Sequence, residues 1–326
     1  MSLSVIDKQH EDYSGILERF RDVSPIYGLC GKILEYDGLD DLLQKTDLDW
    51  EVLQVPVYYE IDNYRPAPGY VANIRSDNYQ LLGIVGKRYH VMNNRELLDY
   101  VVYISSEFEL QVEYAYGLRG GKRIFAFCRY PSFVKMNEIE YWGKVLCFTT
   151  SHDGTRSISL TPIAVRLFDG STYSLCSSRV LSTKHTRRCA SALKVFRKIL
   201  TQFEADFNEF MSNGRKLLQA SYSGSDLIWF LNELFPPPKE GSKASKTRYE
   251  NRIDTIRHII RKLEVGSVRG TWWVLFNAVC AYVDFHVKGR GKYAKENRVV
   301  DAISGPGRDL KAKALTLALS KVEVDI

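Results

Sequence analysis

The central part of the chain contains several short, mainly apolar runs that are rich in β-branched and aromatic residues, a pattern typical of β-strands. These runs occupy residues 70–77, 81–92, 139–152, 155–168 and 171–178. After the second run, residues 93–106 begin with an Asn cap and then repeat apolar residues at helical spacing. The pattern predicts strands, a helix, and then several antiparallel strands.

A hairpin is predicted at residues 114–130, where two aromatic runs flank a glycine turn. One face of its second strand carries two phenylalanines between two arginines: Arg123, Phe125, Phe127 and Arg129. If the opposite face, which begins at Ile124, is buried, both rings lie open beside guanidinium groups, as in proteins that stack single-stranded bases. If the rings are buried instead, the arginines only flank them. Two successive phenylalanines favour this second arrangement.

A long amphipathic helix is predicted after Thr186, because apolar residues recur there every three or four positions. They form one stripe: Cys189, Leu193, Phe196, Leu200, Phe203, Phe207 and Phe210. Its first turns carry a mainly basic row on the other side, formed by Arg187, Lys194 and Lys198. Such a row suits a phosphate backbone, and a solvated helix face has the same pattern.

The C-terminal part is predicted to be helical, with helices at 247–264 and 271–287. The second of these is apolar nearly all round and is therefore expected to be buried. The chain divides into an acidic N-terminal segment (1–64), an α+β central domain (65–235), a linker rich in Pro, Gly, Ser and Lys (236–251), and a basic helical C-terminal region (252–326). The predicted fold class is α+β: an antiparallel sheet packed by a long amphipathic helix, with a helical C-terminal part.

Charge is unevenly distributed along the chain, whose net charge is +6. Residues 1–64 contain 5 Lys and Arg against 14 Asp and Glu, whereas residues 239–313 contain 17 against 8. A basic body favours a polyanionic partner, and ordinary solvated charge is the alternative. No apolar run approaches the ~20 residues that span a bilayer, and the N-terminus is charged, so we expect no membrane and a cytoplasmic location. The six cysteines show no CxxC pairing, which predicts reduced thiols.

Candidate catalytic and metal motifs fail on spacing. A phosphate loop needs four residues between its glycines and a hydroxyl after the lysine, but only three residues separate Gly117 from Gly121, and Arg123 follows Lys122. Ser151, His152 and Asp153 are the residue types of a Ser-His-Asp catalytic triad. However, the side chains of adjacent residues point in different directions, and triads are assembled from separate segments of the chain. No histidine has a partner at ligand spacing. We therefore predict no enzyme activity, no metal and no cofactor.

The basic and aromatic positions predict a nucleic-acid interface instead. A second candidate segment is 286–298, where glycines lie among lysines and arginines, although a flexible solvated loop has the same composition. The predicted nucleic-acid-binding residues are Arg119, Lys122, Arg123, Phe125, Arg129, Arg187, Arg188, Lys194, Lys198, Lys288, Arg290 and Lys292.

Several short motifs in a fixed order resemble the phage/plasmid-like protein family, domain of unknown function 932. They are "WEV" at Trp50, "NIRSD" at Asn73, "LGIVGKRYHVMNNRE" at Leu82, "GLRGGKR" at Gly117, "SHDGT" at Ser151, "KHT" at Lys184 and "GTWWVLFNAVCAYVDFH" at Gly270. One departure is "VRLFDGSTYSLCSS", where members often have Val-Arg-Val-Val-Cys followed by Asn-Thr. The resemblance implies a phage, prophage or plasmid context in a bacterial host, without an agreed activity.

The leading hypothesis is a non-enzymatic DNA-binding protein of such an element, with single-stranded DNA as the favoured partner. The order of helix, strand meander and basic helix also resembles the core of ring-forming single-strand annealing recombinases, which implies a recombination factor and a homo-oligomer. The alternative is a protein-interaction module that inhibits or decoys a host defence system, through the acidic segment or the apolar C-terminal helices.

Overall fold

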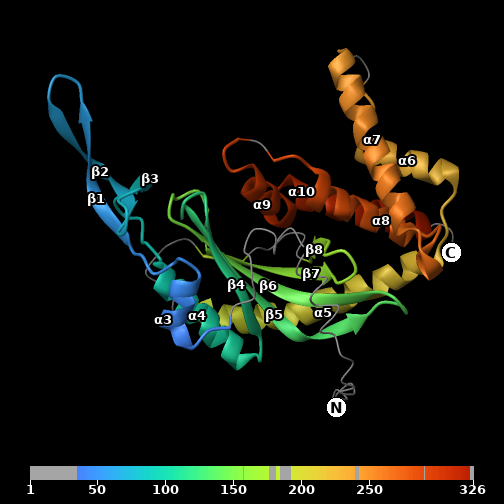
Figure 1. Cartoon of the computed structure of the whole chain (residues 1–326), viewed down its shortest axis with the longest axis horizontal. Helices are drawn as coiled ribbons and strands as arrows, with labels where there is room; N and C mark the ends of the chain where they lie inside the picture. Colours follow the sequence, from blue (N-terminus) through green and yellow to red (C-terminus); the bar gives the residue numbers. More distant parts are fainter. Residues whose placement is uncertain are drawn as a thin grey trace.

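The computed structural model describes residues 35–156, 158–175, 181–183, 192–238, 242–289 and 291–323. They form an α+β fold, as predicted, with two antiparallel sheets and a helical C-terminal part (Figure 1). The larger sheet lies at the centre and has helices on both of its faces. The predicted residues Arg187, Arg188 and Arg290 lie outside the described part of the chain.

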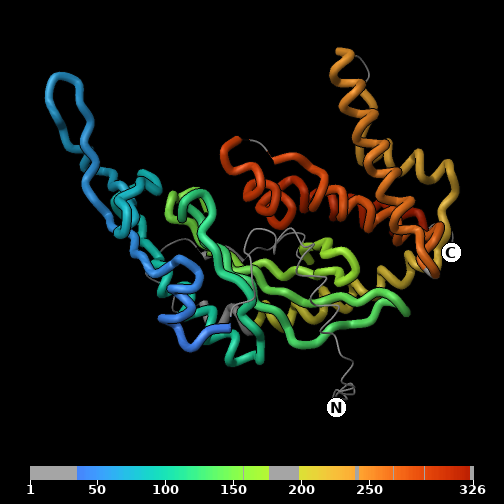
Figure 2. The backbone as a smooth tube through the Cα atoms, in the orientation of Figure 1, coloured from blue at the N-terminus to red at the C-terminus, as the bar shows by residue number. Residues whose placement is uncertain are grey.

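A three-stranded sheet forms an arm that projects from the body (Figure 2). Its strands, in spatial order, are β1 (Val52–Glu60), β2 (Tyr64–Arg75) and β3 (Leu81–Gly86). The base of the arm is bonded to the turn after β6 of the main sheet. There the Asn73 amide donates to the backbone oxygen of His152 (2.7 Å), and the Tyr89 hydroxyl donates to that of Ser151 (2.5 Å). The arm is thus anchored at its base while its far half is exposed.

The main sheet is a meander with the order β4-β5-β6-β7-β8, and β9 pairs with β7. All of these pairs are antiparallel. The strands are β4 (Gln111–Leu118), β5 (Arg123–Lys135), β6 (Tyr141–Ser151), β7 (Ile158–Arg166), β8 (Thr172–Ser174) and β9 (Leu181–Thr183). Before them come α3 (Gly38–Lys45) and α4 (Asn94–Glu107). A capping box between Asn93 and Glu96 begins α4, which confirms the helix predicted at 93–106.

Both faces of the main sheet are covered, each by a different helix. The long amphipathic helix α5 (Ala192–Gln219) packs its phenylalanines, such as Phe203 and Phe207, in one core with Ile124 of β5. The other core joins Phe125 and its face of the sheet to α9 (Ala294–Ser304), through Val299, Val300 and Ile303. Figure 1 shows α5 and α9 on opposite sides of the strands.

The C-terminal helices are α6 (Gly224–Leu234), α7 (Lys243–Leu263), the 3-10 helix η2 (Gly266–Val268), α8 (Trp272–Ala281), the π-helix η3 (Tyr282–His286), α9 and α10 (Pro306–Val322). Every residue of α8 is buried, as its all-round apolar sequence predicted. Helix α7 projects from the body (Figure 1). None of the residues 243–252, which form its far end, is buried.

Two predicted segment boundaries differ from the structure. The boundary after residue 64 falls inside the β1–β2 hairpin, because β2 begins at Tyr64. Residues 243–251 of the predicted linker belong to α7, although their composition resembled a linker. The hydroxyl of Ser242 accepts a hydrogen bond from the backbone N–H of Ser245 (3.3 Å) and so caps this helix.

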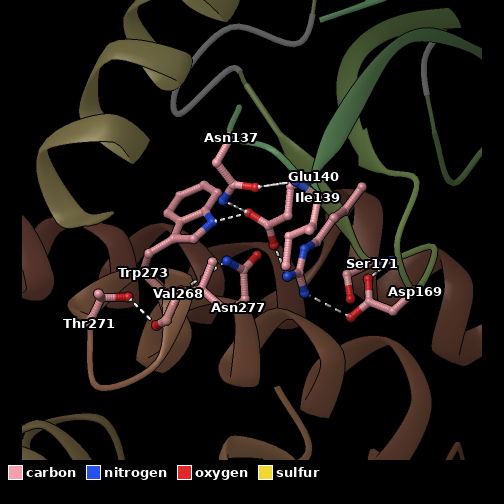
Figure 3. Close-up of polar contacts among 10 residues, drawn as sticks. Asn137, Ile139, Glu140, Asp169, Ser171, Val268, Thr271, Trp273 and Asn277 are labelled. Atoms are coloured by element: carbon pink, nitrogen blue, oxygen red, sulfur yellow. Dashed lines mark hydrogen bonds and ion pairs between the residues drawn. The ribbon is translucent and has the colours of Figure 1, made fainter. Parts of the chain in front are cut away.

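A buried polar cluster joins the sheet to α8 (Figure 3). Glu140, just before β6, forms an ion pair with Arg166 of β7 and accepts a hydrogen bond from the indole N–H of Trp273 (2.7 Å). Arg166 also pairs with Asp169 (3.2 Å). Burial lowers the pKa of the Arg166 guanidinium, and the nearby carboxylate of Asp169 opposes that shift. We call Glu140, Arg166, Asp169 and Trp273 the sheet–helix cluster.

A second buried ion pair joins α10 to η3 and β8. The ammonium group of Lys311 binds the Asp284 carboxylate (2.5 Å) and both the backbone oxygen (2.7 Å) and hydroxyl (2.9 Å) of Thr172. The other carboxylate oxygen of Asp284 accepts the backbone N–H of Thr172 (2.7 Å). Since all three residues are buried, this arrangement fixes α10 and η3 against the sheet.

Candidate nucleic-acid interface

The hairpin at 114–130 forms as β4 and β5, but neither of its faces is open. Phe125 is 5% and Phe127 is 2% exposed, because α9 covers their face, while α5 covers the Ile124 face. The prediction that Phe125 stacks with a base is therefore wrong for the folded protein, since its ring is buried against α9. The rings are buried, but the expectation that both arginines lie at the strand ends holds only for Arg123, because β5 continues past Arg129 to Lys135.

Arg129, in the middle of β5, was also predicted to bind nucleic acid, and the structure contradicts this. Its guanidinium is buried and forms an ion pair with Glu113 of β4 and a hydrogen bond to Gln111. A third hydrogen bond reaches the backbone oxygen of Tyr130 (2.8 Å). The charge of Arg129 is thus neutralised inside the protein, which makes it a structural residue.

The basic row of the long helix lies away from the hairpin arginines. Lys198 is exposed on α5, and α5 packs on the sheet face opposite to the one that carries Arg123. The sheet therefore separates Lys198 from Arg123, and the predicted single track through helix and hairpin is not formed by these two residues. Lys194 belongs to the first turn of α5.

The segment before α9 retains part of its predicted basic surface. Lys288 and Lys292 are exposed, and the Lys292 ammonium lies 5.5 Å from the centre of the Tyr293 ring. Helix α9 then adds the exposed Lys295. Arg119 of the β4–β5 turn donates to the Asn297 side chain of α9 (3.0 Å), so this segment lies beside the tip of the hairpin.

Four cationic side chains gather at one end of the main sheet: Arg119, Lys122, Arg123 and Arg156. The first three belong to the β4–β5 turn and the start of β5, and Arg156 belongs to the turn after β6. These turns are joined because the backbone N–H of His152 donates to the Lys122 oxygen (2.8 Å). We call this group the cationic end. Sequence analysis missed Arg156, which only the pairing of β5 with β6 brings there.

A glycine is required where the β4–β5 turn passes the base of the arm. Gly121 has a φ of +92°, and a Cβ atom there would lie 2.6 Å from the Trp50 ring. The guanidinium group of Arg75 in β2 stacks on the same Trp50 ring, with its central carbon 4.2 Å from the ring centre. The close approach brings the arm against the cationic end.

None of the described carboxylates forms an ion pair with the cationic end. Two acidic groups, Asp153 and Glu296, lie near these cations without forming an ion pair with their side chains. Asp153 accepts from the Thr155 hydroxyl (2.6 Å), and Glu296 accepts from the backbone N–H of Arg119 (2.6 Å). Burial, and then the neighbouring charge of Arg119, lowers the pKa of the Arg123 guanidinium. The cationic end therefore retains positive potential.

The arm carries exposed tyrosines, one of them next to a residue that meets the β4–β5 turn, and sequence analysis did not single them out. Tyr79, in the β2–β3 turn, is 73% exposed, and its backbone has a φ of +56°. Its neighbour Gln80 lies against Gly120 of the β4–β5 turn. Tyr70 is 58% exposed and is paired with Gly86, just before the exposed Lys87. The tyrosine and proline density of residues 56–70 was the available signal.

Open aromatic rings beside unpaired cations suit a single-stranded polyanion with stacking bases. Among the described ranges, no group of three or more His, Cys, Asp or Glu residues could hold a metal ion. Nor is any described helix both long and apolar enough to cross a bilayer. The described cysteines Cys128, Cys147 and Cys280 are buried free thiols.

A family model with the description "Domain of unknown function (DUF932)" matches residues 81–303. The match begins at β3 and ends near the C-terminus of α9, so it includes the main sheet, α5 and the cationic end. No curated protein and no solved structure matches the chain.

Proposed function

Because the chain belongs to this family of unknown function, we propose its function from the geometry: it binds single-stranded DNA and is not an enzyme. The strand lies across the cationic end and the base of the arm, where Tyr70 and Tyr79 stack with bases. The observation that supports this most directly is the group of four cations without a carboxylate partner, beside open rings.

The interface is a revision of the one predicted from the sequence. Arg119, Lys122 and Arg123 remain in it, Lys288 and Lys292 lie on the neighbouring segment, and Arg156 joins them. The rings come from the arm rather than from the hairpin interior. A phage, prophage or plasmid setting, a role in strand annealing, a homo-oligomer and a bacterial cytoplasmic location stay predictions from the sequence.

The alternative, a protein-interaction module directed at a host defence system, also stays a prediction. Its proposed apolar surface is weaker than expected, because all residues of α8 are buried within the protein. Most of the acidic segment lies outside the described residues. The described feature that fits a protein partner is the set of exposed aliphatic side chains on the arm, Leu53, Ile61 and Ile84.

Affinity for an oligothymidylate, measured at increasing salt, tests the proposal. We expect binding at low salt whose logarithm falls linearly with the logarithm of salt, by about 0.7 for each phosphate neutralised. Lys122→Gln should weaken binding and lower that slope by about 0.7, because it removes one phosphate contact. Lys216→Gln, which removes an exposed lysine of α5, is the matched control and should change neither quantity.

Absence of measurable single-strand binding by the unmodified protein at low salt would refute the proposed function. An unchanged slope in the Lys122→Gln variant, together with normal binding, would place the DNA elsewhere on the protein.

A further inference from the structure

A recess opens between the main sheet and α9, next to the cationic end. Its volume is ≈ 430 Å³ including the solvent at its mouth. The sheet side is lined by Arg123, Phe125, Thr149, Thr150, Ser159 and Thr161. Arg156 is contributed by the turn after β6, and Ser304 by α9. The wall on the helix side is apolar and is formed by Val300 and Ile303.

The sheet register explains why hydroxyl groups gather there. Phe125, Thr149 and Ser159 are directly paired across β5, β6 and β7, so their side chains form one row on the same face. The hydroxyls of Thr149 and Ser159 lie 2.5 Å apart. Thr161, two residues further along β7, extends the polar surface on this face.

Arg123 is an unusual residue for the wall of such a recess. It is 9% exposed. Within the described part of the chain its guanidinium donates to the Thr155 hydroxyl (3.3 Å), and its Nε has no partner there. The nearest charged groups are two cations, Arg119 and Arg156, and one anion, Asp153. A buried guanidinium with an unused donor and net positive surroundings is costly unless an anion binds to it.

We propose that the recess binds a phosphate monoester, held by the guanidinium groups of Arg123 and Arg156 and by the hydroxyls of Thr149, Ser159 and Thr161. A monoester carries a charge of about −1.5 to −2 at neutral pH and has three acceptor oxygens, which match two guanidinium groups and a set of hydroxyl donors. An internal phosphodiester carries a single charge and a sugar on each side, which fits a partly enclosed recess less well.

Two molecules present this group: a DNA strand with a terminal phosphate, and a free mononucleotide. The strand as the source rests on the proposed function, whereas the phosphate chemistry of the recess does not. If the strand is the source, the recess holds its terminus while the following nucleotides lie along the cationic end and the base of the arm.

Inorganic phosphate tests the site itself. In a phosphate-free buffer, phosphate should raise the melting temperature of the protein more than chloride at equal ionic strength, because a ligand that binds only the folded state stabilises it. Arg156→Gln should remove most of this shift. Arg156 is exposed at the mouth, so this variant is expected to fold even if Arg123→Gln does not. Lys216→Gln should keep the full shift. An equal effect of chloride, or an unchanged shift in Arg156→Gln, overturns the proposal.

A pair of oligonucleotides then identifies the source. The oligonucleotide with a 5′- or 3′-phosphate should bind about tenfold or more tightly than the same sequence with hydroxyl ends, since one hydrogen bond to a charged group accounts for such a factor. Equal affinities, with phosphate binding intact, overturn the strand source and assign the recess to a mononucleotide, for which deoxyadenosine monophosphate is the probe. Phosphate binding without any DNA binding refutes the proposed function but supports the recess as a phosphate site.

Discussion

Lys311 is a fully buried lysine whose three ammonium donors each have an oxygen partner. The arrangement is stable because the charge of Asp284 and the dipoles of Thr172 replace the water that burial removes. Burial raises the pKa of the Asp284 carboxyl, and the charge of Lys311 and the hydrogen bonds from Thr172 oppose that rise. The Asp284 carboxylate therefore depends on Lys311 and Thr172 for its charged form.

Lys311→Met should destabilise the protein by about 3–5 kcal/mol at about pH 8, because it leaves the Asp284 carboxylate buried without its cation. A carboxyl with a raised pKa in the folded state favours the protonated form. The loss should therefore shrink as the pH falls through the raised pKa of Asp284 and grow as the pH rises through it. Urea denaturation at several pH values measures this.

Lys313→Met, two residues further along α10, is the matched control because Lys313 is exposed and its ammonium group donates to a backbone oxygen, that of Glu233. It should lower stability by no more than about 1.5 kcal/mol, and by the same amount at every pH. A Lys311→Met loss that is the same at acidic and alkaline pH would contradict the assignment to Asp284.

At the scale of elements, the arm is the part whose exposure bears most on function. Its tyrosines contribute little to the core, since Tyr70 and Tyr79 are both largely exposed. Their replacement should therefore affect binding and leave the fold intact. The positive φ of Tyr79 decides how it is best replaced, because asparagine adopts that backbone conformation more readily than alanine does.

Tyr79→Asn and Tyr70→Ala should each weaken single-stranded DNA binding by about 1–3 kcal/mol, the contribution of one stacked base, with an unchanged melting temperature. Fluorescence anisotropy with an oligothymidylate measures the affinity. Tyr103→Ala, which removes an exposed tyrosine of α4, should have no effect on binding. If all three variants bind alike, the arm does not stack with bases.

Periodicity predicted most elements of the main sheet, together with α4, α5, α7 and the buried α8, because each pattern reports local burial. It could not predict which strand face is open. Phe125 is covered by α9, whose residues lie about 170 positions further along the chain, and only long-range packing brings them together. The same limit hid Arg156, which reaches Arg123 through strand pairing. In contrast, the helical residues 243–251 were missed because helix capping and context outweighed a linker-like composition.

At the scale of the whole molecule, the sheet–helix cluster connects parts of the chain that are far apart in the sequence. Glu140 belongs to the sheet, and its carboxylate reaches both Arg166 and Trp273 of α8. The C-terminal helices in turn provide α9, which covers the second face of the sheet. Because α9 forms one wall of the recess, the shape of the recess depends on the contacts of Glu140 with Arg166 and Trp273.

Glu140→Gln should lower the free energy of unfolding by about 3 kcal/mol or more, because Arg166 then remains buried with Asp169 as its remaining carboxylate. Glu138→Gln is the matched control, since Glu138 is exposed two residues earlier and should change stability by less than about 0.5 kcal/mol. Urea denaturation followed by tryptophan fluorescence measures both. Equal stability of the two variants would show that the ion pair contributes nothing net.

The attachment of the arm has a mechanical consequence. Its base is bonded to Ser151 and His152, and the same turn continues to Arg156 at the mouth of the recess. The arm is long compared with that attachment (Figure 1), so a small force at its far end produces a large torque on the turn. A ligand that pulls on the tyrosines at the far end of the arm would therefore transmit force to the backbone that carries Arg156.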